Sequence, residues 1–240
     1  MARDLLSLPP CRYYSDVPSK PRHQAAPKRT FVIGDVHGEV GLLRKLIARL
    51  EPQAEDRLIF LGDYVDRGED SKAVIDYVLE LREIFECVCL KGNHEDMLLD
   101  YLEDDCARYG PLVFLFNGGV ATLESYGATD AEDLRHKMPA EHLAFLHSLL
   151  ERFEDEHYIY VHAGLAPEPA LEEHFASHLW IRDSFIWSRK SFGKKVIFGH
   201  TPQPAPLVMA NKIGLDTGAF YSGVLTALEI PGEIIHQVRK

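Results

Sequence analysis

The residues best suited to chemistry are the two carboxylates and the guanidinium of the stretch GDYVDRG, residues 62–68, which directly follows an apolar run. Charged groups of this kind do not suit a packed core, and the flanking glycines let the backbone approach a ligand closely. Acids beside an arginine are equally typical of a surface salt bridge. Taken alone, this stretch therefore leaves a binding site and a surface ion pair open.

The same pattern returns at the ends of other apolar runs, where glycine accompanies an acid, an amide or an imidazole. The polar residues in question are Asp35, His37, Asp63, Asp66, Arg67, Asn93, His94, His162 and His200. Such groups suit divalent ions like manganese, iron or zinc, and the lack of thiolates argues against structural zinc. Two ions sharing one carboxylate would lower the pKa of a bridging water and clamp a phosphoryl group for in-line attack. The remaining histidines, His142 among them, we expect at the surface.

Apolar runs of strand length position these polar turns. They cover residues 30–33, 58–61, 85–90, 158–161, 196–198 and 212–215. The first three alternate with helical patterns, which favours parallel strands joined by right-handed crossovers. The end of the chain, 223–238, is typical of antiparallel strands. We therefore predict an α/β protein with two mixed sheets packed face to face and helices outside, a four-layer αββα arrangement.

Composition predicts how the chain is divided. Residues 1–28 are interrupted by prolines and locally basic, which is typical of a poorly ordered arm. We predict that residues 29–240 form a single domain, in which the mostly helical stretch 109–150 is a helical cap over one side of the site. A hydrophobic content of 46% and a charged content of 26% are ordinary for a globular protein.

The charge balance limits the partners. A formal net charge of −11 argues against general attraction to nucleic acid or acidic membranes. An anionic substrate stays compatible with it, because bound divalent cations would reverse the local sign. No apolar run reaches the length of a membrane span, no signal-peptide segment is recognisable, and the cysteines show no paired or zinc-like framework. We expect a cytoplasmic protein with neither nucleic acid nor membrane as a partner, and the oligomeric state stays open.

Together these motifs resemble a known family. GDVHG, GDYVDRG, GNHE, HAG and GHTP are similar to the blocks of the phosphoprotein phosphatase family of calcineurin-like metallophosphoesterases. GNHEDML, TLESYG and LWIR are closer to its bacterial and phage branch of serine/threonine protein phosphatases. The resemblance covers about residues 29–230. It implies the metallophosphoesterase fold and two divalent metal ions, with manganese expected first and iron or zinc as alternatives.

The resemblance also implies a set of metal ligands. They are Asp35, His37, Asp63, Asn93, His162 and His200. Asp35, His37 and Asp63 would hold the first metal. Asp63 would bridge to the second, which the other three would complete.

A second implied group handles the substrate. His94 would be the general acid and Asp66 would orient it, which suits a side chain that titrates near neutrality and gains basicity from a carboxylate partner. Arg67 and Arg182 would grip the phosphoryl oxygens through bidentate contacts. An ordinary solvent-facing arginine is the alternative for Arg182. Asp216 is a candidate support for a metal ligand.

One departure from the broader metallophosphoesterases narrows the function. Pro202 stands where those enzymes carry a further metal-binding histidine, so a nuclease is less expected. Tyr221 matches a tyrosine of the eukaryotic members only loosely, and we assign it no role.

These features lead to one expected function and two alternatives. We expect a metal-dependent phosphomonoester hydrolase that removes phosphate from phosphoserine and phosphothreonine by attack of a metal-bridging water, with a phosphoprotein or phosphopeptide as partner. The first alternative is a symmetrical diadenosine tetraphosphate hydrolase. The remote one is an inactive phosphate-binding scaffold, disfavoured because every implied ligand and His94 are present. Few basic residues are expected along the cleft, which favours a single phosphoryl group unless the fold brings Lys91 and Arg108 beside the metals.

Overall fold

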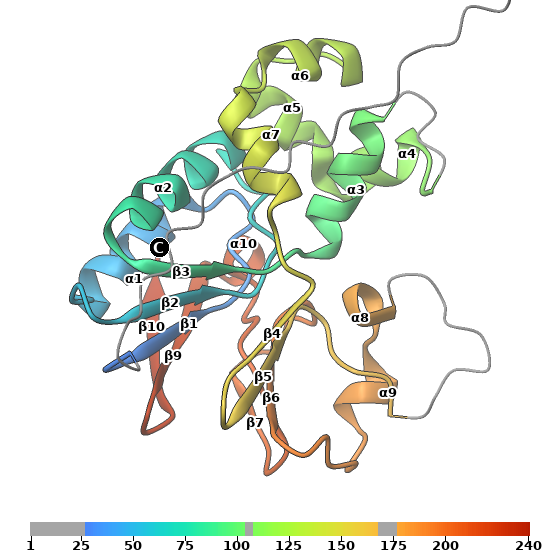
Figure 1. Ribbon diagram of the computed structural model, residues 1–240. Helices are drawn as coiled ribbons and strands as arrows, with labels where there is room; N and C mark the ends of the chain where they lie inside the picture. Colours follow the sequence, from blue (N-terminus) through green and yellow to red (C-terminus); the bar gives the residue numbers. More distant parts are fainter. Residues whose placement is uncertain (1–26, 104–107, 168–176) are drawn as a thin grey trace, which may run out of the picture.

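The computed structural model describes residues 27–103, 108–167 and 177–240. Two five-stranded sheets face each other, and helices lie outside them (Figure 1). The predicted four-layer arrangement of mixed sheets is therefore confirmed. The predicted arm covers residues 1–28, and all but its last two residues, 27 and 28, lie outside the described ranges. Within the described ranges, no helix has the length and apolar character needed to cross a membrane.

The first sheet joins the two ends of the described chain, with the strand order β10-β9-β1-β2-β3. Its strands are β1 (Thr30–Ile33), β2 (Arg57–Phe60), β3 (Glu86–Cys89), β9 (Val224–Ile230) and β10 (Ile234–Arg239). β1, β2 and β3 run parallel, and β9 pairs antiparallel with β1. The crossover helices α1 (Val40–Leu50) and α2 (Ser71–Ile84) cover the outer face (Figure 1). The predicted parallel strands and the antiparallel C-terminus are both confirmed.

The second sheet has the order β4-β5-β6-β8-β7. Its strands are β4 (Arg152–Glu154), β5 (Tyr158–Val161), β6 (Lys195–Phe198), β7 (Leu207–Val208) and β8 (Lys212–Gly214). β5, β6 and β8 are parallel, whereas the edge strands β4 and β7 are antiparallel to their neighbours. Two short helices, α8 (Ser177–Trp180) and α9 (Asp183–Ile186), lie on the side away from the first sheet (Figure 1).

Alternation along the strands distributes apolar side chains over three layers of core. In β1, Val32 packs between the sheets, while Phe31 and Ile33 pack with the outer helices. In β5, Tyr160 packs between the sheets and Ile159 packs on the α9 side. Because both faces of these strands are buried, their sequences are nearly continuous apolar runs. Each fully buried aliphatic or aromatic side chain contributes about 1.5–3 kcal/mol to stability.

A group of helices gathers at one end of the first sheet (Figure 1). It comprises α3 (Asn93–Leu102), α4 (Pro111–Phe114), the π-helical turn η1 (Leu115–Gly119), α5 (Val120–Tyr126), α6 (Ala131–Lys137) and α7 (Ala140–His147). The helical content expected for 109–150 is present, and its role as a cap stays a prediction. A further short helix, α10 (Ala219–Ser222), precedes β9.

The expectation that His142 lies at the surface is wrong. Its side chain is fully buried in α7, with Nδ1 2.7 Å from the Tyr126 hydroxyl and Nε2 2.9 Å from an Asp76 oxygen. Tyr126 in α5 and Asp76 in α2 thus satisfy both ring nitrogens, and neither residue is near His142 in sequence.

Candidate metal centre

The turns that follow β1 and β2 are bonded directly to each other. The backbone N–H groups of Val36 and His37 donate to the Asp63 carbonyl at 3.1 and 2.8 Å. His37 and Asp63 both adopt left-handed backbone angles, with φ of 46° and 54°. Gly92 comes so close that a Cβ atom there would lie 2.0 Å from Asp63 Oδ1. Strained, tightly packed backbone of this kind is characteristic of functional sites.

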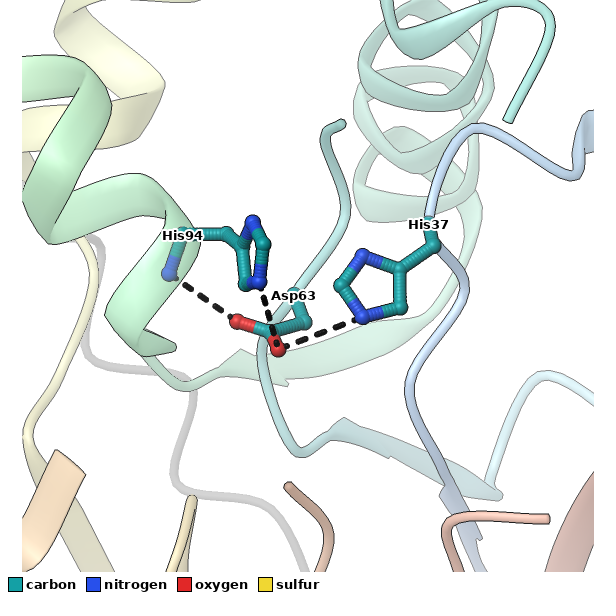
Figure 2. Close-up of side chains that lie close together, drawn as sticks. All are labelled: His37, Asp63 and His94. Carbon is teal, nitrogen blue, oxygen red and sulfur yellow. Dashed lines mark hydrogen bonds and ion pairs between the residues drawn. The ribbon is translucent and has the colours of Figure 1, made fainter. Parts of the chain in front are cut away.

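Asp63 lies at the centre of the site, and its carboxylate faces two imidazoles (Figure 2). Its Oδ2 is 3.4 Å from His37 Nε2 and 4.0 Å from His94 Nε2, and its Oδ1 accepts from the His94 backbone N–H at 3.1 Å. All three side chains are buried, and their donor atoms lie within 4.8 Å of one another. This is one group that could hold a metal ion.

A second group shares Asp63 and draws on the other sheet. His162 follows β5 and His200 follows β6, and with Asp63 they again place donor atoms within 4.8 Å of one another. His162 Nε2 is 3.4 Å from Asp63 Oδ1. Asn93 Oδ1 lies 3.0 Å from His162 Nε2 and 2.9 Å from His200 Nδ1. The predicted sharing of Asp63 between two groups of ligands is compatible with this geometry.

The hydrogen bonds of the imidazoles test whether a metal fits. His162 Nδ1 donates to the Leu61 carbonyl at 2.9 Å, so Nε2 carries a lone pair. That lone pair faces oxygen acceptors of Asn93 and Asp63, an arrangement that a cation between them would make favourable. His37 Nδ1 likewise lies 2.9 Å from the Val65 carbonyl, a contact that leaves Nε2 as an acceptor and is the usual support for a metal-binding histidine.

Four buried side-chain polar atoms of the described residues lack a hydrogen-bond partner, and two of the four belong to predicted metal ligands. These two are Asp35 Oδ1 and His200 Nε2. The other Asp35 oxygen accepts from the His200 backbone N–H at 2.8 Å. Burial, together with the carboxylates of Asp216 and Asp63, raises the pKa of Asp35. A bound cation would relieve that repulsion, so these residues fit the implied metal.

The geometry and the resemblance differ on one point. The first compact group of donors contains His94 beside His37 and Asp63, whereas the resemblance implies Asp35 in that place. The environment distinguishes the histidines. Burial lowers the pKa of His37 to about 3 and that of His200 to about 2, so both are neutral near pH 7, as metal ligands must be. Burial also acts on His94, but Asp63 and Asp66 outweigh it and raise its pKa.

His94 lies between a carboxylate and a guanidinium. Its Nδ1 is 2.7 Å from Asp66 Oδ2, and its Nε2 is 2.8 Å from Arg67 Nη2. Arg67 Nη1 lies 2.8 Å from His37 Nε2, so one guanidinium spans both imidazoles. The structure therefore brings these predicted residues together at one edge of the first sheet.

Asp66 is held by two hydroxyl side chains to which the sequence analysis assigns no role. Thr122 Oγ1 in α5 donates to Asp66 Oδ1 at 2.6 Å. The Asp66 backbone N–H donates to Ser71 Oγ at 2.9 Å and to Thr122 Oγ1 at 3.0 Å. No local sequence signal connects Asp66 to Thr122, because the contact depends on how α5 packs against α2.

Glu95 is a further residue that sequence reasoning overlooked. Its carboxylate accepts from the backbone N–H groups of Asp63, Tyr64, Val65 and Gly92 at 2.7–3.2 Å. It thus ties the turn after β2 to the start of α3. A signal was present, because a glutamate three residues after a helix N-cap is typical of a capping box.

Arg182 and the other cations near the site have different surroundings. Arg182 is exposed, and its Nη1 donates to the His200 carbonyl at 3.2 Å. Lys91 Nζ lies 3.1 Å from Asp96 Oδ1, and Arg108 Nη1 lies 2.8 and 2.9 Å from the two oxygens of Asp96. Arg182 therefore lies beside the second group of ligands, whereas Lys91 and Arg108 share the carboxylate of Asp96.

Comparisons with known proteins bear on the identity of this site. The family model for calcineurin-like phosphoesterases matches residues 28–221. Serine/threonine-protein phosphatase 1 of Salmonella typhimurium is 32% identical over 215 residues, covering 85% of this chain and 92% of the relative. Bis(5'-nucleosyl)-tetraphosphatase PrpE [asymmetrical] of Anoxybacillus flavithermus is 27% identical over 230 residues, covering 83% and 89%.

Solved structures agree with the fold. The crystal structure of a candidate diadenosine tetraphosphatase superposes with a TM-score of 0.67 at 22% identity, covering 89% of this chain and 95% of that one. A cold-active protein tyrosine phosphatase superposes with a TM-score of 0.63 at 16% identity, covering 89% and 76%. With the paired sheets and the buried histidine–carboxylate groups, these matches lead to one conclusion: the chain belongs to the calcineurin-like phosphoesterase family.

Proposed function

We propose that this chain is a metal-dependent phosphomonoester hydrolase that acts on phosphoserine and phosphothreonine in proteins. A serine/threonine-protein phosphatase at 32% identity, covered nearly end to end, supports this reading. The geometry supports it as well, since the imidazole of His94, the carboxylate of Asp66 and the guanidinium of Arg67 converge beside the candidate metal ligands. Phosphoproteins would be its macromolecular partners.

In this proposal the metal ligands are the residues that the resemblance implies. They are Asp35, His37, Asp63, Asn93, His162 and His200. When bound, two divalent ions would activate water and neutralise phosphoryl charge. Manganese is our first candidate, with iron or zinc as alternatives, because the donors are oxygens and imidazole nitrogens.

The remaining chemistry belongs to the chain's own side chains. His94 would donate the proton that the departing serine or threonine oxygen requires, from Nε2. Asp66, 2.7 Å from Nδ1, would hold the ring in the matching tautomer and raise its proton affinity. Arg67, whose guanidinium spans His37 and His94, would hold phosphoryl oxygens from one side. Arg182 would approach from the side of His200.

One observation carries the choice of substrate. Lys91 and Arg108 would be needed to neutralise the further phosphates of a dinucleoside polyphosphate, but both contact the buried carboxylate of Asp96. Lys91 also lies 3.5 Å from Glu151. Arg67 and Arg182 then supply the positive side chains at the centre, which suits one phosphoryl group clamped with two metals.

A second candidate function is hydrolysis of dinucleoside polyphosphates. The relatives at about a quarter identity that carry this name favour it. Their names describe an asymmetrical enzyme, whereas the alternative considered from the sequence is the symmetrical one.

A direct kinetic comparison tests the proposal. Purified protein with Mn²⁺ would be assayed for kcat/KM on a phosphothreonine peptide and on diadenosine tetraphosphate, with p-nitrophenyl phosphate as a general substrate. We expect the peptide to be preferred by at least about tenfold. Preference for the dinucleotide would overturn the substrate assignment, and inactivity on all three substrates would support an inactive scaffold.

A further inference from the structure

An open pocket of about 440 Å³ lies directly beside Arg67. Residues from η1, α5 and α10 line it, among them Phe116, Val120, Glu124, Phe220 and Tyr221. Arg67 is the residue that the pocket shares with the metal-centre motifs, and Asn117 and Gly118, from a turn outside the sheet pattern, form part of its wall.

The pocket gathers apolar side chains that are unusually exposed. Phe116 is 85% exposed, Tyr221 66%, Val120 49% and Phe220 38%. Single exposed apolar residues need no explanation, but apolar side chains gathered at one place typically mark a binding surface. Here they come from two segments far apart in the chain that meet only in the fold.

Backbone contacts join the pocket rigidly to Arg67. The Gly118 carbonyl accepts from the Arg67 backbone N–H at 3.1 Å. Gly118 has a φ of 105°, and a Cβ atom there would lie 2.7 Å from Arg67 Cγ, so only glycine fits this approach. Asn117 Nδ2 donates to the Val113 carbonyl at 2.8 Å and holds the turn. On the other side, Arg67 Cζ lies 5.7 Å from the centre of the Tyr221 ring.

We infer that this pocket binds an apolar side chain next to the phosphorylated residue of a peptide substrate. The inference rests on the proposed function. A phosphoryl group held by Arg67 would place the neighbouring residues of an extended peptide about 3.3–3.6 Å further along per residue, which is within reach of the pocket. Aromatic walls would then bury a leucine- or phenylalanine-like side chain.

Charge favours this occupant over a nucleotide. Arg67 is the cation among the residues that line the pocket, and Glu124 contributes a carboxylate to the same wall. A ligand that suits the pocket therefore places its phosphate beside Arg67 and brings no further negative charge towards Glu124. A dinucleoside polyphosphate would bring additional phosphates towards Glu124, whereas a peptide with an apolar neighbour would not.

Matched peptides test the inference. Two sets of phosphothreonine peptides would differ only in leucine or alanine on either side of the phosphothreonine, and kcat and KM would be measured with Mn²⁺. For the wild-type protein we expect a kcat/KM about tenfold higher for the leucine peptide, mainly through KM, from burial of its extra carbons. In Phe116→Ala, and separately in Tyr221→Ala, this ratio should fall towards one.

Ile84→Ala is the matched control, because Ile84 is also an exposed apolar residue, 60% accessible, but lies at the end of α2 that precedes β3. It should keep the tenfold ratio. Equal cleavage of both peptides by the wild-type protein would overturn the inference and leave the proposed function standing. Cleavage of diadenosine tetraphosphate but of no phosphopeptide, with a raised KM for the dinucleotide in Phe116→Ala, would overturn both and identify a nucleobase as the occupant.

Discussion

The candidate site has two rims, one at the edge of each sheet, and they are built differently. The first rim carries His37, Asp63 and His94, and the second carries His162 and His200. On the rim of the first sheet, the turns are fastened by dedicated side chains: Glu95 binds four backbone N–H groups, and Thr122 binds Asp66. On the rim of the second sheet, His162 and His200 take their orientation from the first sheet, through the Leu61 carbonyl and Asp35. The first rim is therefore prearranged, and the second is aligned by docking onto it.

The rims also differ in charge. Asp66 and Arg67 flank His94 on the first rim, and neighbouring carboxylates raise the pKa of His94. On the second rim, burial lowers the pKa of both His162 and His200. Burial also lowers the pKa of His37 on the first rim, so the two neighbouring carboxylates set His94 apart from the other three histidines. In the proposed function, His94 would transfer the proton and the other three would be neutral ligands. The difference leads to predictions that separate the two rims.

The largest effect is expected where the rims meet. Asp63 lies 3.4 Å from both His37 and His162, so Asp63→Asn should weaken both metal sites. Loss of several kcal/mol of transition-state stabilisation would lower activity by about 10⁴-fold. Metal analysis of the reconstituted wild-type protein should find about two divalent ions per chain. A variant that keeps both ions and its activity would show that Asp63 does not bridge.

The next effect isolates proton transfer on the first rim. His94→Asn should leave metal content nearly unchanged and lower kcat on a phosphopeptide by about 10³-fold, within the range of about 10²–10⁴-fold for a positioned acid. The loss should shrink on p-nitrophenyl phosphate, because its leaving group barely requires a proton. Equal losses on both substrates, or loss of an ion, would place His94 among the metal ligands, as the compact group with His37 allows.

A paired experiment separates the metals themselves. His37→Ala and His200→Ala should each lower the affinity for one ion by about 100-fold or more. Loss of a residue that only supports a metal ligand typically lowers metal affinity by about 10–100-fold, and loss of the ligand itself should lower it at least as much. Isothermal titration with Mn²⁺ should still find one tight site in each variant. If either variant lost both sites, the rims would form a single cooperative centre.

The smallest effect concerns the support of Asp66. Thr122→Val keeps the shape of the side chain but removes the hydroxyl that contacts Asp66 at 2.6 Å. We expect kcat on a phosphopeptide to fall about tenfold, at the low end of outer-contact effects. Thr122→Ser, which retains the hydroxyl, should recover most of the activity. Equal kcat values in the valine variant and the wild-type protein would mean that Ser71 alone holds Asp66.

Much of the fold was predictable because its signals are local. Apolar runs of strand length, the helical spacing after them and the glycine-flanked polar turns are all properties of short segments. Parallel strands bring their carboxyl ends to one edge of a sheet, which is why Asp35, Asp63 and Asn93 lie close together. The two-sheet arrangement followed from the same runs.

Tertiary structure alone decided the contacts between distant segments. Lys91 and Arg108 both contact Asp96 in α3. The Arg108 contact depends on how residues 108–109 pack against α3, and no local sequence pattern predicts that packing. The same holds for the hydrogen bond from Thr122 to Asp66, for the burial of His142, and for the pocket that Phe116 and Tyr221 both line. Sequence patterns predict which residues end a strand. The partners that meet them depend on the packing of whole helices and sheets, because long-range contacts form only when those elements are assembled.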